Sequence, residues 1–175
     1  MKMRFDSPAE FRHFLDELKK RLEEREVRRM DKPDFRRSAV KILIMNRNSV
    51  PHVLLTVRTD KVRTHKGQIS LPGGSYDETD GHILETAYRE TWEETGIPRE
   101  KIEYIGGFDE YLSMFGFHIS CFVGAVDYPV EYNFNSDEIS DYVEAPLSIF
   151  VNQDFEKVEK MNYQGRDFRI FYYRY

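Results

Sequence analysis

The chain has 175 residues, of which 40% are hydrophobic and 33% are charged, and its formal net charge is −5. This length favours a single domain, and the hydrophobic fraction is too high for an intrinsically disordered chain. No apolar run approaches the roughly 18 residues of a membrane-spanning helix, so we expect no membrane partner. A mildly acidic chain is also a poor general binder of nucleic acid, because contacts to phosphates need a positive surface.

The single cysteine, Cys121, excludes an intramolecular disulfide and a metal site built from several cysteines. The N-terminal sequence MKMRFDSPAE has no apolar stretch of the kind that a signal peptide needs. Both features are typical of a protein in a reducing compartment, and we expect a cytoplasmic protein.

Residues 7–29 have the pattern of one helix. Ser7 is a favourable N-cap, Pro8 suits the first helical position, and Glu10 completes a Ser-x-x-Glu capping box. The apolar residues that follow have helical spacing and predict a stripe that packs on the rest of the protein. A dimer contact through this stripe is the alternative, and the sequence does not select it. The stripe consists of Phe11, Phe14, Leu15, Leu18 and Leu22.

Residues 31–34 break this pattern, so we expect a helix and linker over 1–34 and a domain over 35–175. Within the domain, Gly96 and Pro98 end a predicted helix. The element order predicts an α+β protein with several antiparallel pairings. We expect strands at 38–45, 53–58, 68–71, 101–111 and 117–126, helices at 83–95 and 147–150, a short element starting near residue 137, and a hairpin of strands 155–161 and 167–175.

Three glutamates, Glu90, Glu93 and Glu94, lie three and four residues apart on the predicted helix and therefore share one face. Like charges in this arrangement destabilise a helix, and the helix dipole disfavours anions near the C-terminus. One interpretation is a solvated acidic face, partly offset by Arg89. The other is a site for Mg²⁺ or Mn²⁺, which prefer oxygen ligands. Gly73 and Gly74 would allow the backbone to approach a metal or phosphate closely, although a plain tight turn also explains them.

Residues 89–97, RETWEETGI, resemble the second half of the Nudix box, REUxEExGU, in which U is a bulky apolar residue. Thr91 departs from the pattern at the first U position. In the first half, Asp80 stands where the box has Glu, and one extra residue precedes Arg89. Residues 54–74 are similar to a pattern of the coenzyme A pyrophosphatase-like subgroup of Nudix hydrolases, with Thr59 in place of Ser or Ala and Leu71 in place of Phe. The matching positions are Leu54, Leu55, Thr56, Arg58, Arg63, Gly67, Pro72, Gly73 and Gly74.

This resemblance implies a Nudix-type α/β/α sandwich with a mixed sheet, here with an added N-terminal helix. It implies that Glu90 and Glu94 bind Mg²⁺ or Mn²⁺, with Glu93 as a third ligand or a base. By the same resemblance, Arg89 orients the carboxylates and the Gly74 carbonyl adds a ligand.

The implied activity is hydrolysis of a small nucleoside diphosphate derivative, with coenzyme A cleaved to 4′-phosphopantetheine and adenosine 3′,5′-bisphosphate. Another diphosphate, such as ADP-ribose, NADH or a dinucleotide polyphosphate, is the first alternative. A non-catalytic scaffold that binds nucleotides or a partner is the second. Hydrolysis of RNA 5′ ends would call for a broader basic surface than this chain offers.

The general base is expected in a later loop, where Glu138 is the first candidate and Glu144 the second, although each could be an ordinary surface acid. The loop before the box is basic and suits contacts to phosphates, including the 3′-phosphate of coenzyme A. An ordinary charged loop is the alternative. The expected substrate-binding residues are Arg58, Arg63, His65, Lys66 and Gly73.

Several aromatic residues leave two interpretations open. We expect Trp92 to pack within the helix layer rather than to stack on a base. Tyr104, Tyr111, Phe115 and Phe117 could stack on adenine or could fill the core. The C-terminal sequence FRIFYYRY differs from the strand and helix with which the subgroup usually ends, and this difference bears on the far wall of the substrate pocket.

Overall fold

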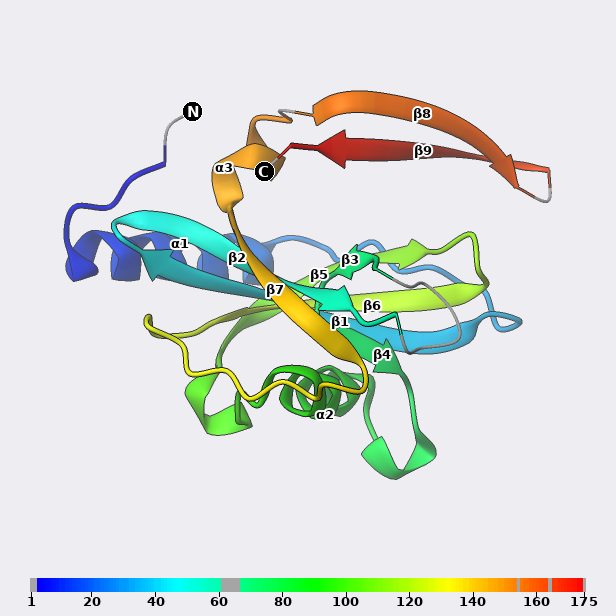
Figure 1. Cartoon of the computed structure of the whole chain (residues 1–175), viewed down its shortest axis with the longest axis horizontal. Coiled ribbons are helices and arrows are strands. Elements are labelled where there is room, and N and C mark those ends of the chain that lie inside the picture. The colour runs from blue at the N-terminus through cyan, green and yellow to red at the C-terminus, as the bar shows by residue number, and fades with distance from the viewer. Residues whose placement is uncertain (1–2, 61–66, 154, 164, 175) are drawn as a thin grey trace.

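The computed structural model describes residues 3–60, 67–153, 155–163 and 165–174. Figure 1 shows a central sheet with helices on either side and a separate hairpin at the C-terminal end. The helices are α1 (Pro8–Glu24), α2 (Ile83–Thr95) and α3 (Leu147–Val151), with 3₁₀ turns η1 (Glu78–Asp80) and η2 (Arg99–Lys101). The strands are β1 (Arg36–Arg47), β2 (Val50–Arg58), β3 (Ile69–Ser70), β4 (Gly73–Ser75), β5 (Glu103–Leu112), β6 (Phe117–Ala125), β7 (Ile139–Pro146), β8 (Phe155–Tyr163) and β9 (Arg166–Tyr173).

The central sheet has the strand order β3-β2-β1-β6-β5, with β7 paired to β2 and β4 paired to β1. β1 runs parallel to β6, from Arg36 opposite Phe117 to Ile44 opposite Ala125. The other pairings in this sheet are antiparallel. β4 pairs with the first half of β1, and β2 pairs with the second half. This mixed sheet confirms the predicted α+β class.

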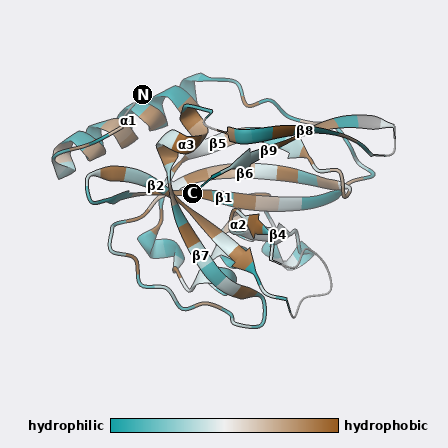
Figure 2. Ribbon diagram, turned by 45° about the horizontal axis from the view of Figure 1, so that its top comes forward, coloured by the Kyte–Doolittle hydropathy of each residue, from teal (hydrophilic) through white to brown (hydrophobic). Residues whose placement is uncertain are grey.

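Successive residues of β1 point to opposite faces of the sheet, and each face has its own core. Leu43 and Met45 belong to one buried cluster, which contains Tyr88 of α2. Ile44 belongs to a second cluster, which contains Leu15 and Leu22 of α1. The two helices therefore cover opposite faces, as expected for an α/β/α sandwich. Figure 2 shows the apolar stripe of α1 and the apolar strands that it covers.

The N-terminal helix begins as predicted but ends earlier. The Ser7 hydroxyl accepts the Glu10 N–H at 3.2 Å, while the Glu10 carboxylate accepts the N–H of Asp6 rather than of Ser7. The helix ends at Glu24 and not at residue 29. After it, the chain follows β5: the N–H of Arg28 donates to Asp109 and the N–H of Met30 donates to Glu110. These long-range contacts compete with helical hydrogen bonds, which explains the error in the predicted boundary.

The C-terminal strands β8 and β9 form a two-stranded sheet of their own, as the sequence predicted. In Figure 1 this hairpin lies over the central sheet, with β9 between β8 and the rest of the chain. None of the helices in the described ranges combines the length and apolar character needed to cross a bilayer.

Candidate active site

A cleft of about 930 Å³ opens beside α2 and the first half of β1. The strand β4 contributes Gly73 and Gly74, and the C-terminal end of β2 contributes Arg58. Four acidic side chains line the same cleft: Glu90, Glu93 and Glu94 from α2, and Glu138 from the loop before β7. Segments that are far apart in the sequence thus bring carboxylates, a guanidinium and glycine backbone together.

The helix that carries three of these carboxylates has the predicted bounds and well-defined ends. The His82 side chain accepts the N–H of Leu84 at 3.1 Å, and Gly96 ends the helix in the left-handed conformation with φ 73°. The buried Thr91 hydroxyl donates to the carbonyl of Ala87 at 2.6 Å. A polar residue can therefore occupy this buried position, because its hydroxyl is satisfied within the helix.

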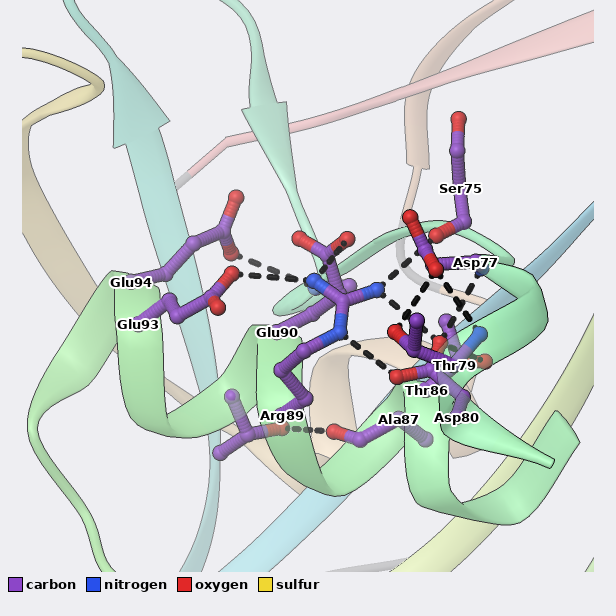
Figure 3. Close-up of polar contacts among 12 residues, drawn as sticks. Ser75, Asp77, Thr79, Asp80, Thr86, Ala87, Arg89, Glu90, Glu93 and Glu94 are labelled. Atoms are coloured by element: carbon purple, nitrogen blue, oxygen red, sulfur yellow. Dashed lines mark hydrogen bonds and ion pairs between the residues drawn. The ribbon is translucent and has the colours of Figure 1, made fainter. Parts of the chain in front are cut away.

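Arg89 connects the carboxylates of the cleft to the chain before α2 (Figure 3). Its Nε donates to Asp80 at 2.7 Å and its Nη1 donates to Glu90 at 2.9 Å and to Glu93 at 3.0 Å. Its Nη2 donates to Asp80 and to the carbonyl of Ser75. Arg89 holds the pKa of Asp80 well below its usual range. A single guanidinium thus sets the positions of three acidic side chains.

Glu94 is the most buried carboxylate of the cleft, with 2% of the residue exposed. It accepts the N–H of Gly73 at 3.2 Å, and Arg58 lies 3.7 Å away. Burial raises the pKa of Glu94 to about 8, and the charges of Glu90 and Glu138 act in the same direction. Burial also raises the pKa of Glu90. A positive charge near a buried carboxylate stabilises its ionised form. The cleft therefore favours a further positive charge in addition to that of Arg58.

The two glycines of β4 allow close packing at the floor of the cleft. A Cβ atom on Gly74 would overlap the carboxylate of Glu90, and one on Gly73 would overlap the backbone carbonyl of Ala39. Gly74 thus leaves room for the Glu90 side chain, whereas Gly73 leaves room for the neighbouring strand β1. These contacts require both glycines, which a plain tight turn would not explain.

The model of the NUDIX domain matches residues 35–162, which is most of the chain. The chain belongs to the Nudix family. A Citrobacter koseri protein named as an uncharacterized Nudix hydrolase NudL is 36% identical over 113 residues, which are 65% of this chain and 59% of that protein. A protein of the same name from an Enterobacter species is 33% identical over 135 residues, which are 77% of this chain and 70% of that protein. The chain thus spans about 60–70% of the length of these relatives.

Solved Nudix structures show the same fold. An Ap4A hydrolase from Caenorhabditis elegans, crystallised as a binary complex, has a TM-score of 0.55 at 16% identity, covering 67% of this chain and 84% of that chain. The NUDIX domain of Shewanella oneidensis NrtR, crystallised with ADP ribose, has a TM-score of 0.54 at 23% identity, covering 70% and 79%. At these identities the likeness concerns the Nudix fold alone.

Asp80 contacts Arg89 despite the extra residue that precedes Arg89 in the sequence. The 3₁₀ turn Glu78–Asp80 ends at Gly81, which has φ 69°. This turn brings the Asp80 carboxylate to the guanidinium of Arg89, with 4% of its side chain exposed. The sequence indicated the position of Asp80 but not this contact.

The fold places the two candidate bases, Glu138 and Glu144, in different environments. Glu138 lines the cleft, and its backbone carbonyl accepts the N–H of Thr59 at 2.8 Å, which anchors the loop to the end of β2. Glu144 instead lies buried on β7, where it accepts hydrogen bonds from Arg47 at 2.9 Å and from the Tyr132 hydroxyl at 2.8 Å. Glu144 is therefore a structural residue of the sheet, and Glu138 is the candidate that reaches the cleft.

The far end of the cleft is aromatic and includes a residue that the sequence did not indicate. Phe115 and Phe117 line it, together with Tyr163 from the C-terminal hairpin. The rings of Phe115 and Tyr163 lie 6.4 Å apart, and the guanidinium of Arg36 lies 4.4 Å from the ring of Phe117. Tyr163 was missed because its position depends on how the hairpin packs. The only related signal in the sequence was that the C-terminal residues 168–175, FRIFYYRY, depart from the subgroup pattern.

Of the remaining expected site residues, some line the cleft and others lie outside the described residues, and the expectation for Trp92 is wrong. Arg58 and Gly73 line the cleft, whereas Arg63, His65 and Lys66 lie outside the described residues. The expectation that Trp92 packs within the helix layer is wrong, since 57% of the residue is exposed. The inward face of α2 is taken by Tyr88 and small threonines, so Trp92 faces outward.

Proposed function

We propose that this protein is a metal-dependent Nudix pyrophosphohydrolase that cleaves coenzyme A or a coenzyme A derivative. The products would be 4′-phosphopantetheine, carrying any acyl group, and adenosine 3′,5′-bisphosphate. The observation that carries the proposal is the position of Glu90 and Glu94, two carboxylates with raised pKa values, in the same cleft as Arg58. The carboxylates suit a cation and the guanidinium suits a polyanion, so the cleft can bind both together.

The donor set of the cleft fits Mg²⁺ or Mn²⁺, which are hard cations with a preference for oxygen ligands. Glu90 and Glu94 are the proposed ligands, and Glu93 and the carbonyl of Gly74 are further donors. Within the described ranges, no three acidic, histidine or cysteine side chains already converge as a metal-binding group. When bound, the cation would neutralise charge on the diphosphate and lower the pKa of a bound water.

The chain's own residues have distinct roles in this proposal. Arg89 would hold Glu90 and Glu93 in place. Glu138 would accept the proton of the attacking water, with Glu93 as the alternative base. The water oxygen would form a bond to one phosphorus of the diphosphate, and the bond between that phosphorus and the bridging oxygen would break. The departing phosphate would keep the bridging oxygen and its electron pair.

Arg58 would contact a substrate phosphate. Its Nε is buried and has no hydrogen-bond partner among the residues described, and its guanidinium lines the cleft. A planar guanidinium suits bidentate binding of a phosphate. Arg63, His65 and Lys66 are proposed from the sequence pattern to bind the 3′-phosphate of coenzyme A.

The preference for coenzyme A is supported by the pattern in residues 54–74, whereas the aromatic end of the cleft supports binding of an adenine nucleotide in general. Phe115, Phe117 and Tyr163 offer π-faces of the kind on which an adenine ring stacks. ADP-ribose, NADH and diadenosine polyphosphates contain the same adenine and a similar phosphoanhydride bond. These compounds are therefore the competing substrates in any test.

The test incubates the protein with Mg²⁺ or Mn²⁺ and with coenzyme A, acetyl-coenzyme A, ADP-ribose, NADH and diadenosine polyphosphates, and separates the products by chromatography. We expect adenosine 3′,5′-bisphosphate from both coenzyme A substrates. Turnover of ADP-ribose alone would contradict the proposed substrate. Binding of nucleotide without turnover of any diphosphate would indicate a non-catalytic scaffold. Glu94→Gln should abolish turnover, whereas the exposed Glu100→Gln serves as the matched control.

A further inference from the structure

The outer edge of the C-terminal hairpin is open. In the described part of the chain, β8 pairs with β9 alone, and Figure 1 shows β8 on the side of the hairpin away from the central sheet. An edge strand presents backbone N–H and C=O groups that can pair with another strand. A two-stranded sheet is also marginal by itself and is stabilised by additional strands. The edge of β8 is therefore suited to receive a further strand.

The charges along β8 match those of a second copy of the same strand. Residues 156–160 read Glu-Lys-Val-Glu-Lys. If two β8 strands pair antiparallel about a twofold axis at Val158, Lys157 of one chain lies opposite Glu159 of the other. Glu156 then lies opposite Lys160, next to the bulge that interrupts β8 between Phe155 and Lys157. Every charged residue in this segment thus faces the opposite charge, which stabilises cross-strand pairing.

The same segment is available for such a contact. In the present chain Lys157 forms an ion pair with Glu159, and Glu156 lies 3.3 Å from Arg174. All four side chains are at least 40% exposed, and exposed ion pairs contribute little to stability, so these pairs can exchange partners at small cost. Val158, at the centre, is 40% exposed and pairs across the hairpin with Phe171, which is 41% exposed. An apolar contact between the two Val158 side chains at the twofold axis would cover Val158.

Charged residues on an edge strand also serve to prevent aggregation. Charges of one sign would serve that purpose against a second copy, because like charges directly opposite each other destabilise pairing. The alternating signs of residues 156–160 have the opposite effect for self-pairing. This difference favours a second copy of the chain as the occupant of the edge.

We propose that the protein forms a homodimer through antiparallel pairing of β8 with β8 of a second copy, which joins the two hairpins into a four-stranded sheet. The isologous contact places the same residues on both sides of the twofold axis, as in most symmetric dimers. It lies on the edge of the hairpin and uses none of the carboxylates of the cleft.

The test uses two charge-reversed variants of the full chain. Glu156→Lys/Glu159→Lys makes the segment basic, and Lys157→Glu/Lys160→Glu makes it acidic. Sedimentation equilibrium at low ionic strength should show a concentration-dependent dimer for the natural sequence and monomers for each variant alone. An equimolar mixture of the two variants should restore the dimer, because each basic residue then faces an acidic one. Circular dichroism confirms that each variant is folded.

The matched control is Glu17→Lys/Glu24→Lys, which makes the same charge change at exposed positions of α1. We expect this control to dimerise like the natural sequence. A natural sequence that stays monomeric over the whole concentration range would overturn the proposal. Dimers in either β8 variant alone, or loss of the dimer in the α1 control, would place the interface elsewhere and would also overturn it.

Discussion

Asp80 accepts hydrogen bonds from two nitrogens of Arg89, at 2.7 Å from Nε and 3.1 Å from Nη2. The remaining nitrogen of the guanidinium, Nη1, holds Glu90 and Glu93. Asp80 therefore acts on the carboxylates of the cleft through Arg89 and does not itself line the cleft.

Asp80→Asn should lower turnover about 10- to 100-fold, which is typical when an outer-shell partner of a metal ligand is lost. The neutral amide removes one acceptor and the charge that orients Arg89, so Glu90 and Glu93 lose their fixed positions. Steady-state kinetics and Mn²⁺ titration on the same samples measure both effects. Glu78→Gln, on the same 3₁₀ turn but exposed, is the control. Full activity in Asp80→Asn would show that Arg89 needs no anchor.

The two glycines of β4 should respond differently to alanine. In Gly74→Ala the new methyl group meets the end of the Glu90 side chain, which can move away. We expect this variant to fold normally and to lose metal affinity and turnover. In Gly73→Ala the methyl group meets the backbone of Ala39 and Val40 in β1, which cannot move freely. We expect that variant to lose about 2 kcal/mol or more of stability, as measured by urea unfolding. Equal effects of the two substitutions would contradict this distinction.

Metal binding should depend on pH through Glu94. Its pKa of about 8 in the metal-free protein means that the carboxyl is protonated at neutral pH, whereas a metal ligand must be deprotonated. Apparent Mn²⁺ affinity should therefore rise by up to about tenfold per pH unit below pH 8 and level off above it. Calorimetry in buffers of different ionisation enthalpy should detect proton release at pH 7. Affinity that is constant from pH 6 to pH 8 would rule out this coupling.

Glu94 should also affect the stability of the metal-free protein. Burial raises its pKa from 4.5 to about 8, so the folded state binds more protons than the unfolded state between these values. Its contribution to stability is present at low pH and is lost as the pH rises through this window. In the presence of a chelator, Glu94→Gln should be more stable than the natural sequence above pH 8. Urea unfolding at pH 5 and pH 8.5 measures the difference, which should be smaller at pH 5.

Lys41 gives the opposite pH dependence. It is fully buried on β1, with its Nζ 3.3 Å from the centre of the Tyr88 ring and no hydrogen-bond partner in the described ranges. Burial, assisted by Arg99, lowers its pKa from 10.5 to about 7. The unfolded state then binds more protons between pH 7 and 10.5, so stability should rise with pH by at most about 1.4 kcal/mol per unit.

Lys41→Met should remove this rise, because the thioether side chain fills a similar volume without a charge. We expect it to be more stable than the natural sequence at pH 7, measured by urea unfolding across the pH range. Lys20→Met on the exposed face of α1 is the control. A variant with an unchanged pH profile would show that Lys41 is charged in the folded protein throughout this range.

The aromatic end of the cleft should affect binding more than chemistry. Tyr163→Ala removes the ring that lies 6.4 Å from Phe115, and we expect KM for the preferred substrate to rise about tenfold with little change in kcat. Tyr172→Ala, on the other strand of the same hairpin and outside the cleft lining, controls for damage to the hairpin. A fall in kcat at constant KM would place Tyr163 close to the reacting phosphates instead.

Local signals in the sequence were sufficient for most elements and for part of the site. Gly96 and Pro98 predicted where helix α2 ends, and the spacing of Glu90, Glu93 and Glu94 predicted its acidic face. The hairpin of β8 and β9 was predicted from two strand-like segments separated by a short turn. Patterns of this kind depend on neighbours within one or two turns of the chain, which the sequence contains in full.

Contacts between distant segments were decided only by the tertiary structure. It pairs β1 parallel to β6, ends α1 at Glu24 where the chain meets β5, turns Trp92 outward, and distinguishes Glu138 in the cleft from Glu144 in the sheet. It also brings Tyr163 to the cleft from near the C-terminal end. The sequence by itself therefore determined which residues form the helix and its carboxylates. Packing decided which of the remaining side chains share the cleft, because the stability of a long-range contact depends on every element between its two residues.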